Sequence, residues 1–402
     1  MKNLSKTHSI VFSQLKFRGG KVSKNRIVKS SMSERLCTFD ETDLDKRGNP
    51  TSDYLKLYKV WGEVKIGIII LGNISIHREY LEARGNLVID KNSKWDPVEA
   101  IEPIVRVTKS NGSLVIGQLT HGGRQTPKTV NQEPVSASDS QSPDCFGISF
   151  GRARALSVDE IKDIVMRFGY GAEVLYKAGS DGVQLHAAHG YLLCGSLENR
   201  SRIIFEIIYE IKRRINDDRF IISIKYNCHD FIEGGFSFED CQTLSKRFEE
   251  EGVELIELSG GTYEFLPLEE NRDEINKREG FFIDFAEKIK PTLRDSTVLA
   301  VTGGFRTLSG IGSALRESLR VEGLGMNRTS SCDMVGLGRP LVTEPDLIKK
   351  FYSLETDMAK RNELSFGLDV RECYEIFKRI GKGEEIPELS DDQSLKQEFL
   401  IS

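Results

Sequence analysis

The chain has 402 residues, of which 39% are hydrophobic, and its 56 lysines and arginines against 61 aspartates and glutamates give a net charge of −5. This length can bury a large core and fits two small domains or one large α/β barrel. A mildly acidic chain without a basic stripe argues against a nucleic-acid-binding protein. The longest apolar run, Ile66–Leu71, has the length of a strand, so no membrane-spanning segment and no membrane partner are expected.

The cysteines and the N-terminus indicate the cellular compartment. The seven cysteines are scattered and never spaced as C-x-x-C, which predicts free thiols and no zinc or iron–sulfur site built from cysteine. The N-terminal segment lacks the apolar core of a signal peptide. We therefore expect a soluble cytoplasmic protein.

Short apolar runs alternate with longer amphipathic ones along most of the chain. The short runs are rich in Val, Ile and Leu, as is typical of parallel strands covered on both faces. The predicted strands are Arg26–Ser30, Ile66–Gly72, Leu114–Leu119, Gly182–His186, Phe220–Tyr226, Val253–Ser259, Thr297–Thr302 and Met334–Gly338. The predicted helices include Ser157–Tyr176, Ser237–Glu250, Lys277–Lys290, Thr343–Tyr352 and Val370–Ile380.

Eight strands alternating with helices predict an α/β fold of the (β/α)8 TIM-barrel type. A doubly wound sheet is the alternative, but it normally has a glycine-rich turn after its first strand, and the segment after Arg26–Ser30 has none. We expect a single barrel domain over residues 1–352. Residues 353–402 are predicted to form a C-terminal extension that is partly helical, with a flexible acidic end.

Glycine turns follow the last two predicted strands, where barrels usually bind phosphate. Thr297–Thr302 runs into Gly303 and Gly304, and Met334–Gly338 runs into Arg339. Glycines let backbone N–H groups approach phosphate oxygens, and arginine adds a charged donor. The two turns together predict a phosphate site.

The fourth predicted strand ends in two histidines, His186 and His189, with Tyr191 shortly after. Three interpretations are open: core histidines bonded to backbone carbonyls, a metal pair with His121 as a third ligand, or a polar clamp on a substrate oxygen. We favour the clamp, because no carboxylate accompanies the histidines and the Tyr191 phenol could supply a proton.

Two further polar residues stand at predicted strand ends. Lys225, within an apolar run, suits a Schiff-base lysine of a lyase, a counter-charge for an anionic cofactor ring, or a lysine extending from the barrel rim. Gln118 carries the donor and acceptor needed to bind the imide edge of a heterocycle.

These motifs together resemble the old yellow enzyme family of NADH:flavin oxidoreductases, which are FMN-dependent barrels that reduce activated alkenes. The resemblance covers roughly residues 8–352. It rests on Lys24–Val28 with Ser31–Ser33, Gln118–Arg124, His186–Leu192, Gly303–Thr307 and Gly338–Pro340.

The resemblance implies noncovalent FMN and assigns a role to each position. The backbone of Ser31 and Met32 would border the flavin, the Ser33 hydroxyl would bind flavin O4, and Gly72 would pass under the ring. Gln118 would bind the pyrimidine edge, and Lys225 would balance the charge of the reduced flavin. The phosphate would be held by Gly303, Gly304, Gly338 and Arg339.

The implied reaction takes hydride from NADH or NADPH and delivers it to an enone, nitroalkene or similar small electrophilic alkene. His186 and His189 would bind the acceptor's oxygen and Tyr191 would protonate the substrate, with no metal involved. The resemblance leaves a homo-oligomer open.

The sequence departs from the family in two places. The long loop that the family has after Leu193 is missing, which favours as an alternative a flavin-binding barrel with weak activity. With no lid over the site, we also expect high oxidase activity. The segment Leu308–Ser331 is longer than one helix requires, and its polar part, Arg320–Ser331, is predicted to be a surface loop.

Overall fold

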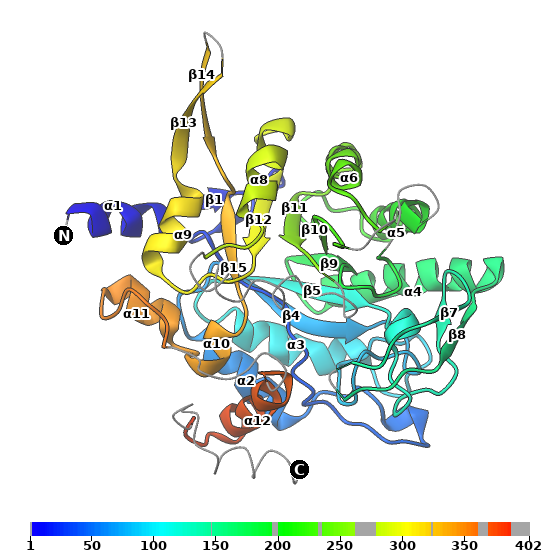
Figure 1. Ribbon diagram of the computed structural model, residues 1–402. Helices are drawn as coiled ribbons and strands as arrows, with labels where there is room; N and C mark the ends of the chain where they lie inside the picture. The colour runs from blue at the N-terminus through cyan, green and yellow to red at the C-terminus, as the bar shows by residue number, and fades with distance from the viewer. Residues whose placement is uncertain are drawn as a thin grey trace.

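The computed structural model describes residues 2–145, 147–194, 200–231, 235–261, 279–322, 325–360 and 369–386. Eight parallel strands close into a barrel with helices around it (Figure 1). Around the barrel, the strands follow one another in chain order: β3 (Ile27–Lys29), β4 (Ile68–Ser75), β5 (Leu114–Thr120), β9 (Gly182–Ala187), β10 (Ile221–Asn227), β11 (Leu255–Ser259), β12 (Val298–Thr302) and β15 (Met334–Leu337). Each predicted run overlaps one of these strands, so the predicted (β/α)8 barrel is confirmed.

The amino-terminal half of the barrel is filled by apolar side chains. Val28, Ile68 and Leu255, each at the first or second position of its strand, belong to one buried cluster. Leu15 and Phe17, from the hairpin of β1 (Leu15–Lys16) and β2 (Val22–Ser23), join the same cluster. The hairpin therefore closes this end of the barrel, and polar chemistry is left to the other end.

The helices surround the barrel. They are α1 (Lys2–Val11), α2 (Ser52–Gly62), α3 (Pro97–Thr108), α4 (Val158–Lys177), α5 (Arg200–Arg214), α6 (Phe238–Glu250), α8 (Ile283–Ile289), α9 (Leu308–Leu315), α10 (Pro340–Thr343), α11 (Leu347–Ser353) and α12 (Asp369–Lys382). Single 3-10 turns occur at η1 (Leu44–Lys46), η2 (Gly123–Gln125) and η3 (Lys290–Thr292). The serines predicted to start α4 and α6 both form capping boxes, through Ser157 and Ser237.

Helix α12, predicted as Val370–Ile380, is confirmed and packs against α2. The Phe377 ring lies 5.8 Å from that of Trp61, whose indole N–H donates to the carbonyl of Leu341 on α10 at 2.9 Å. The C-terminal segment thus covers a helix of the barrel, while the domain boundary at residue 352 stays a prediction.

Three predictions between the strands need correction. The predicted loop Arg320–Ser331 is largely a β-hairpin, formed by β13 (Glu317–Glu322) and β14 (Gly325–Ser330), which projects from the barrel in Figure 1. The helix predicted from Lys277 begins, within the described residues, only at Ile283, because Gly280 occupies a turn with φ +77°. The helix predicted as Thr343–Tyr352 begins only at Leu347, as α11, because residues 344–346 form a turn after the short helix α10.

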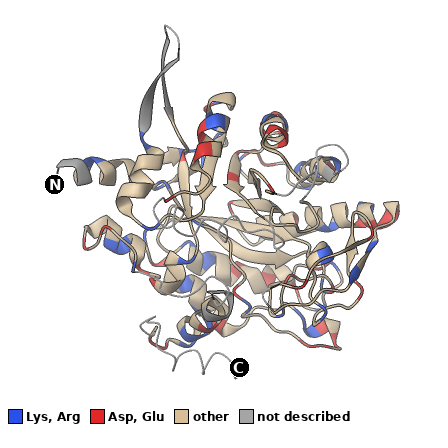
Figure 2. Ribbon diagram, viewed as in Figure 1, with Lys and Arg blue, Asp and Glu red and all other residues tan. Residues whose placement is uncertain are grey.

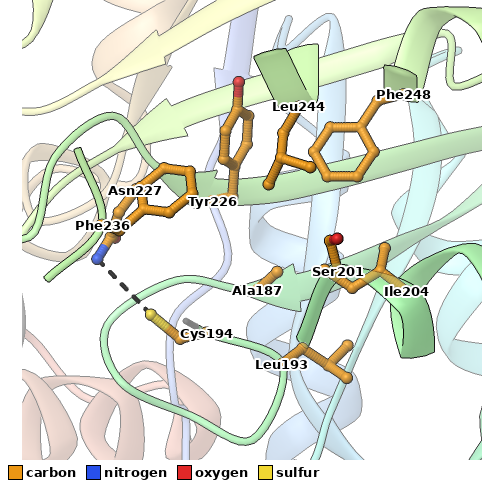
Figure 3. A pocket seen from close by; sticks show the side chains of 10 residues that line it. All are labelled: Ala187, Leu193, Cys194, Ser201, Ile204, Tyr226, Asn227, Phe236, Leu244 and Phe248. Carbon is orange, nitrogen blue, oxygen red and sulfur yellow. Dashed lines mark hydrogen bonds between the residues drawn. The ribbon is translucent and has the colours of Figure 1, made fainter. Parts of the chain in front are cut away.

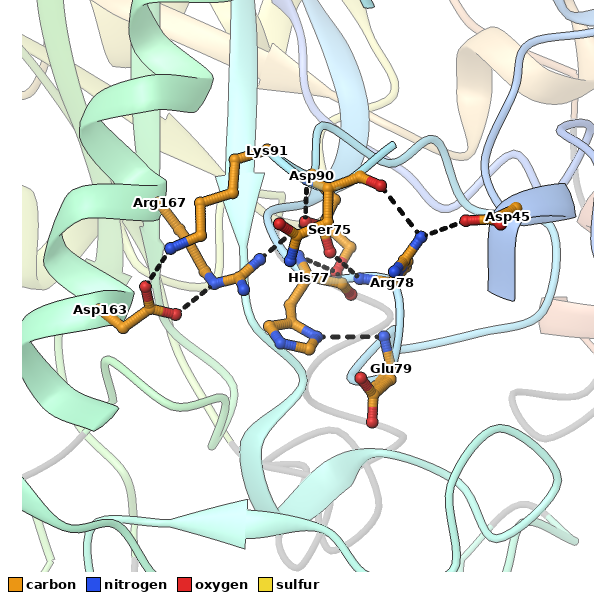
Figure 4. A network of polar contacts seen from close by, with 10 residues as sticks. Asp45, Ser75, His77, Arg78, Glu79, Asp90, Lys91, Asp163 and Arg167 are labelled. Carbon is orange, nitrogen blue, oxygen red and sulfur yellow. Dashed lines mark hydrogen bonds and ion pairs between the residues drawn. The ribbon is translucent and has the colours of Figure 1, made fainter. Parts of the chain in front are cut away.

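Ion pairs and hydrogen bonds connect the segment between β4 and α3 to α4 (Figure 4). Arg167 of α4 pairs with Asp90 at 2.8 Å and with Asp163 at 2.6 Å, and both Arg167 and Asp90 are buried. The Arg78 backbone N–H also donates to Asp90, at 3.0 Å. This network fixes the segment that surrounds His77. Nearby, β6 (Val135–Ser136), β7 (Ser140–Gln141) and β8 (Arg152–Ala155) form a small separate sheet.

Lysines and arginines are interspersed with acidic residues over the outer helices (Figure 2). All seven cysteines are free thiols. Among the helices that the structure describes, none combines the length and the apolar character needed to cross a bilayer.

Candidate active site

The two histidines and the tyrosine predicted to act together are neighbours at the carboxyl end of β9. The His186 ring lies 5.3 Å from that of His189 and 4.8 Å from that of Tyr191, both edge-on. His186 and Tyr191 are each 5% exposed. The strand end therefore gathers two imidazoles and a phenol in one place.

Hydrogen bonding fixes the tautomer of His186. Its Nδ1 accepts the backbone N–H of Ala188 at 3.3 Å, so the proton of the neutral ring lies on Nε2. Burial, with the charges of His189 and Lys225, lowers its pKa well below the usual value. His186 thus offers a neutral Nε2–H donor at neutral pH.

His189 is held in an unusual conformation. Its φ of +62° is rare for a residue with a side chain, and its backbone N–H donates to Asn227 Oδ1 at 3.2 Å. Its Nε2 lies 2.9 Å from the Ser259 hydroxyl. Burial, followed by the charge of Lys225, lowers its pKa to about 3, so this ring is neutral as well.

Lys225 lies beside His186 in the barrel, because the two residues are in register between β10 and β9. On its other side it is in register with Glu257 of β11, and Lys225 Nζ lies 3.1 Å from Glu257 Oε1. The two side chains are 7% and 1% exposed. This ion pair was not predicted. The sequence signal that could have predicted it is the position of Glu257, an acid inside the apolar run Val253–Ser259. Lys225 has the same kind of position inside the preceding strand.

Gln118 belongs to a chain of directed hydrogen bonds. The Ser31 hydroxyl donates to Gln118 Oε1 at 2.7 Å, and Gln118 Nε2 donates to Gln184 Oε1 at 2.7 Å. Gln118 and Gln184 are almost fully buried. The predicted Ser31 and Gln118 are therefore brought together, and Gln184 is an addition to them.

The segment after β3 is fixed by its own side chains. The Ser33 hydroxyl donates to Glu82 Oε2 at 2.5 Å, so its hydrogen is already engaged by a carboxylate. A Cβ on Gly72 would overlap the Glu34 carboxylate and the Met32 carbonyl oxygen. The structure thus shows that Gly72 has to be a glycine because of its contacts with Met32 and Glu34.

The two glycine turns are neighbours, since Thr302 of β12 is in register with Gly336 of β15. Gly303 and Gly304 have positive φ values of 144° and 77°, which favour glycine. Among the described residues, a Cβ on Gly338 would meet only Met32 Sδ, at 3.7 Å, so these residues leave the space in front of Gly338 open.

The metal interpretation required His121 to join the histidine pair. The His121 ring instead stacks on Tyr80 at 4.9 Å, and its Nδ1 accepts the backbone N–H of Gly123 at 3.1 Å. Over the described residues, no group of three or more His, Cys, Asp and Glu side chains could hold a metal ion.

A small apolar cavity lies behind the strand ends, between β9, β10 and the helices α5 and α6 (Figure 3). Its lining includes Leu193, Tyr226 and Phe248, and the Asn227 amide approaches the Cys194 thiol at 3.9 Å. The cavity volume is only about 10 Å³, so the cavity admits at most one water molecule.

Comparisons with known proteins agree with this architecture. Residues 11–305 match the model of the NADH:flavin oxidoreductase / NADH oxidase family. The chain is 36% identical over 343 residues to the NADH-dependent flavin oxidoreductase nadA of Aspergillus parasiticus, across 80% of this chain and 74% of the relative.

Solved structures share the fold. The chain matches a 2-naphthoyl-CoA reductase with a TM-score of 0.76 at 19% identity, across 93% of this chain and 58% of that one. It matches the old yellow enzyme homologue of Zymomonas mobilis with a TM-score of 0.67 at 22% identity, across 88% and 95%. The chain belongs to the NADH:flavin oxidoreductase family of old yellow enzyme type, whose cofactor is FMN.

The residues present fit that cofactor. A buried amide, a buried lysine and two adjacent glycine turns stand at the carboxyl ends of β5, β10, β12 and β15. This donor set suits a ring with an imide edge together with a phosphate.

Proposed function

We propose that this oxidoreductase reduces an activated alkene, such as an enone or a nitroalkene, with NADH or NADPH as the reductant, and that it works in the cytoplasm. Residues 1–352 would carry the site and residues 353–402 would form a C-terminal extension. Bound FMN would supply hydride transfer between nicotinamide and alkene. The observation that carries the proposal is the neutral His186 beside His189 and Tyr191.

His186 and His189 would bind and orient the alkene's carbonyl or nitro oxygen. The Nε2–H of His186 is the donor that its bond to Ala188 leaves available. A hydrogen bond to that oxygen strengthens as negative charge develops on it, so the pair would favour hydride addition at the distal carbon. Tyr191 would then donate its phenolic proton to the neighbouring carbon.

Other residues would hold the cofactor. Gln118 would bind the pyrimidine edge and Lys225 the side of the ring that becomes negative. Ser31 and Met32 would border the ring. Ser33 would bind flavin O4 by turning its hydroxyl hydrogen away from Glu82, to which it donates in the structure. The phosphate would be bound by Gly303, Gly304, Gly338 and Arg339.

Phenol binding tests the histidine pair. A phenolate over FMN gives a long-wavelength charge-transfer band, and two hydrogen bonds of about 1 kcal/mol each predict about 30-fold weaker phenol binding in His186→Ala/His189→Ala. FMN should remain bound. His8→Ala, on α1, is the control and should bind phenol as the wild type does. Unchanged phenol binding in the double variant would contradict this role.

The alternative, a flavin-binding barrel with weak activity, rests on the missing loop after Leu193, and residues 195–199 lie outside the described part of the chain. Steady consumption of NADH with an enone under nitrogen distinguishes the two. FMN retention without such consumption would favour the alternative.

A further inference from the structure

The pair of Lys225 and Glu257 places a full negative charge beside the lysine assigned to the flavin. The two charged groups are 3.1 Å apart and almost completely buried. Water therefore screens them little, and each charge is felt by whatever binds next to it.

Glu257 accepts hydrogen bonds from two side chains besides its ion pair with Lys225. Its Oε1 accepts the Thr302 hydroxyl at 2.7 Å, and its Oε2 accepts Gln184 Nε2 at 3.0 Å. Burial alone would raise its pKa, but the charge of Lys225 and these hydrogen bonds lower it. Glu257 is therefore a carboxylate at neutral pH.

Gln184 extends the influence of this carboxylate across the barrel. Because Gln184 donates to Glu257, its oxygen faces the other way and accepts from Gln118, which in turn accepts from Ser31. The orientation of the Gln118 amide and the position of the Lys225 ammonium group thus depend on the same carboxylate.

We propose that Glu257 is a positioning residue that lowers the reduction potential of the bound flavin. The proposal rests on the proposed function. Transfer of one hydride from NADH to FMN gives NAD⁺ and a singly negative reduced flavin, so one negative charge appears on the ring. Lys225 stabilises that charge less when Glu257 already balances it than it would alone. A lower potential makes the reduced flavin a better donor to an alkene.

The test is the potential of Glu257→Gln. The amide keeps the shape of the side chain and one oxygen for Thr302 or Gln184, but it removes the charge. We expect reduced FMN to gain about tenfold in affinity relative to oxidised FMN, which raises the two-electron potential by about 30 mV. Dye equilibration on the FMN-loaded protein measures the potential, and fluorescence titration measures the affinity for oxidised FMN.

Glu254→Gln is the matched control. Glu254 is also buried, but it precedes β11 at the opposite end of the barrel, where it accepts the Gly19 backbone N–H at 3.2 Å. This variant should keep the wild-type potential, because its charge is separated from the strand ends by the apolar core.

A second pair of variants keeps the proposal testable if Glu257→Gln alone fails to fold. In Lys225→Gln the Glu257 charge remains, whereas in Lys225→Gln/Glu257→Gln both charges are gone. The double variant should therefore have the higher potential of the two. Equal potentials within either pair, wild type with Glu257→Gln or these two, would overturn the inference and leave the proposed function intact. Failure of the wild type to bind FMN would overturn both.

Discussion

Tyr191 is the residue proposed to transfer a proton to the substrate carbon. Its ring lies against His186, so the phenol stands beside the neutral donor proposed for the substrate oxygen. An unperturbed phenol has a pKa of about 10, which suits an acid for a carbanion-like centre. Tyr191→Phe should therefore slow alkene reduction by about 10²–10⁴-fold and leave reduction of FMN by NADH nearly unchanged.

Stopped-flow measurement of the two half-reactions checks this prediction. Tyr170→Phe, on the outer helix α4, removes a phenol away from the strand ends and should change neither rate. Equal slowing of both half-reactions in Tyr191→Phe would remove the tyrosine from the proton-donor role.

Contacts between residues that are close in sequence were predictable, whereas contacts that depend on the register of two paired strands were not. His186, His189 and Tyr191 are close in sequence at a strand end, so the sequence alone predicts that they meet. Glu257 meets Lys225 only because β10 and β11 pair in one register. A shift of one residue would turn Glu257 to the other face of the sheet.

At the scale of elements, Gly72 couples β4 to the segment after β3. A Cβ at this position would overlap the Glu34 carboxylate and the Met32 carbonyl oxygen. Glu34 cannot move aside easily, because it forms a buried ion pair with Lys29 at 2.9 Å. Gly72→Ala should therefore lower the free energy of unfolding by about 3 kcal/mol, at the upper end for overpacking. Urea unfolding of the apoprotein measures this.

Gly338→Ala separates folding from cofactor binding. Of the residues that the structure describes, the added methyl group would touch only Met32 Sδ at 3.7 Å, so the apoprotein should unfold at the wild-type urea concentration. The same methyl group would occupy the space in front of the proposed phosphate turn. We expect FMN affinity to fall at least tenfold, measured by flavin fluorescence. Wild-type FMN affinity in this variant would place the phosphate elsewhere.

The strands were predictable because all eight are short apolar runs covered on both faces, interrupted only by isolated polar residues such as Lys225 and Glu257. The ends of the helices were less predictable, because packing imposes turns such as the one at Gly280. Gly280 packs against the Phe305 ring. The hairpin of β13 and β14 was missed because its polar residues have the composition of a loop. Its strands are defined by their pairing with each other, which the composition of the segment does not reveal.

For the whole molecule, buried histidines make stability depend on pH. Burial lowers the pKa of His77, His121, His186 and His189. For His77 the pKa falls to about 4, through burial and then the charge of Arg167 in the network of Figure 4. For His189 it falls to about 3. All four rings are neutral in the folded protein at neutral pH.

These shifts predict that stability falls as the medium is acidified from pH 7 to pH 5. In this range the unfolded chain, whose histidines have a pKa of about 6.5, binds protons that the folded protein does not bind. At pH 5 this costs about 2 kcal/mol for each of His77 and His189. Asp40 and Glu160, whose pKa values lie at about 2 when folded, lose their contributions only below this range. Burial raises the pKa of Glu254, so this one carboxyl group contributes in the opposite direction and favours the folded protein as the pH falls.

Urea unfolding between pH 7.5 and pH 5 measures the slope, and His77→Asn tests its origin. The variant removes one of the four groups, so its free energy of unfolding should fall less on acidification than that of the wild type, by about 2 kcal/mol at pH 5. Asparagine keeps an acceptor, Oδ1, for the Glu79 backbone N–H that His77 Nδ1 accepts at 3.2 Å, so the variant removes the titrating ring and keeps this bond. A wild-type protein equally stable at both pH values would mean that these rings take up protons in the folded state, and His186 would then meet the alkene's oxygen as a cation.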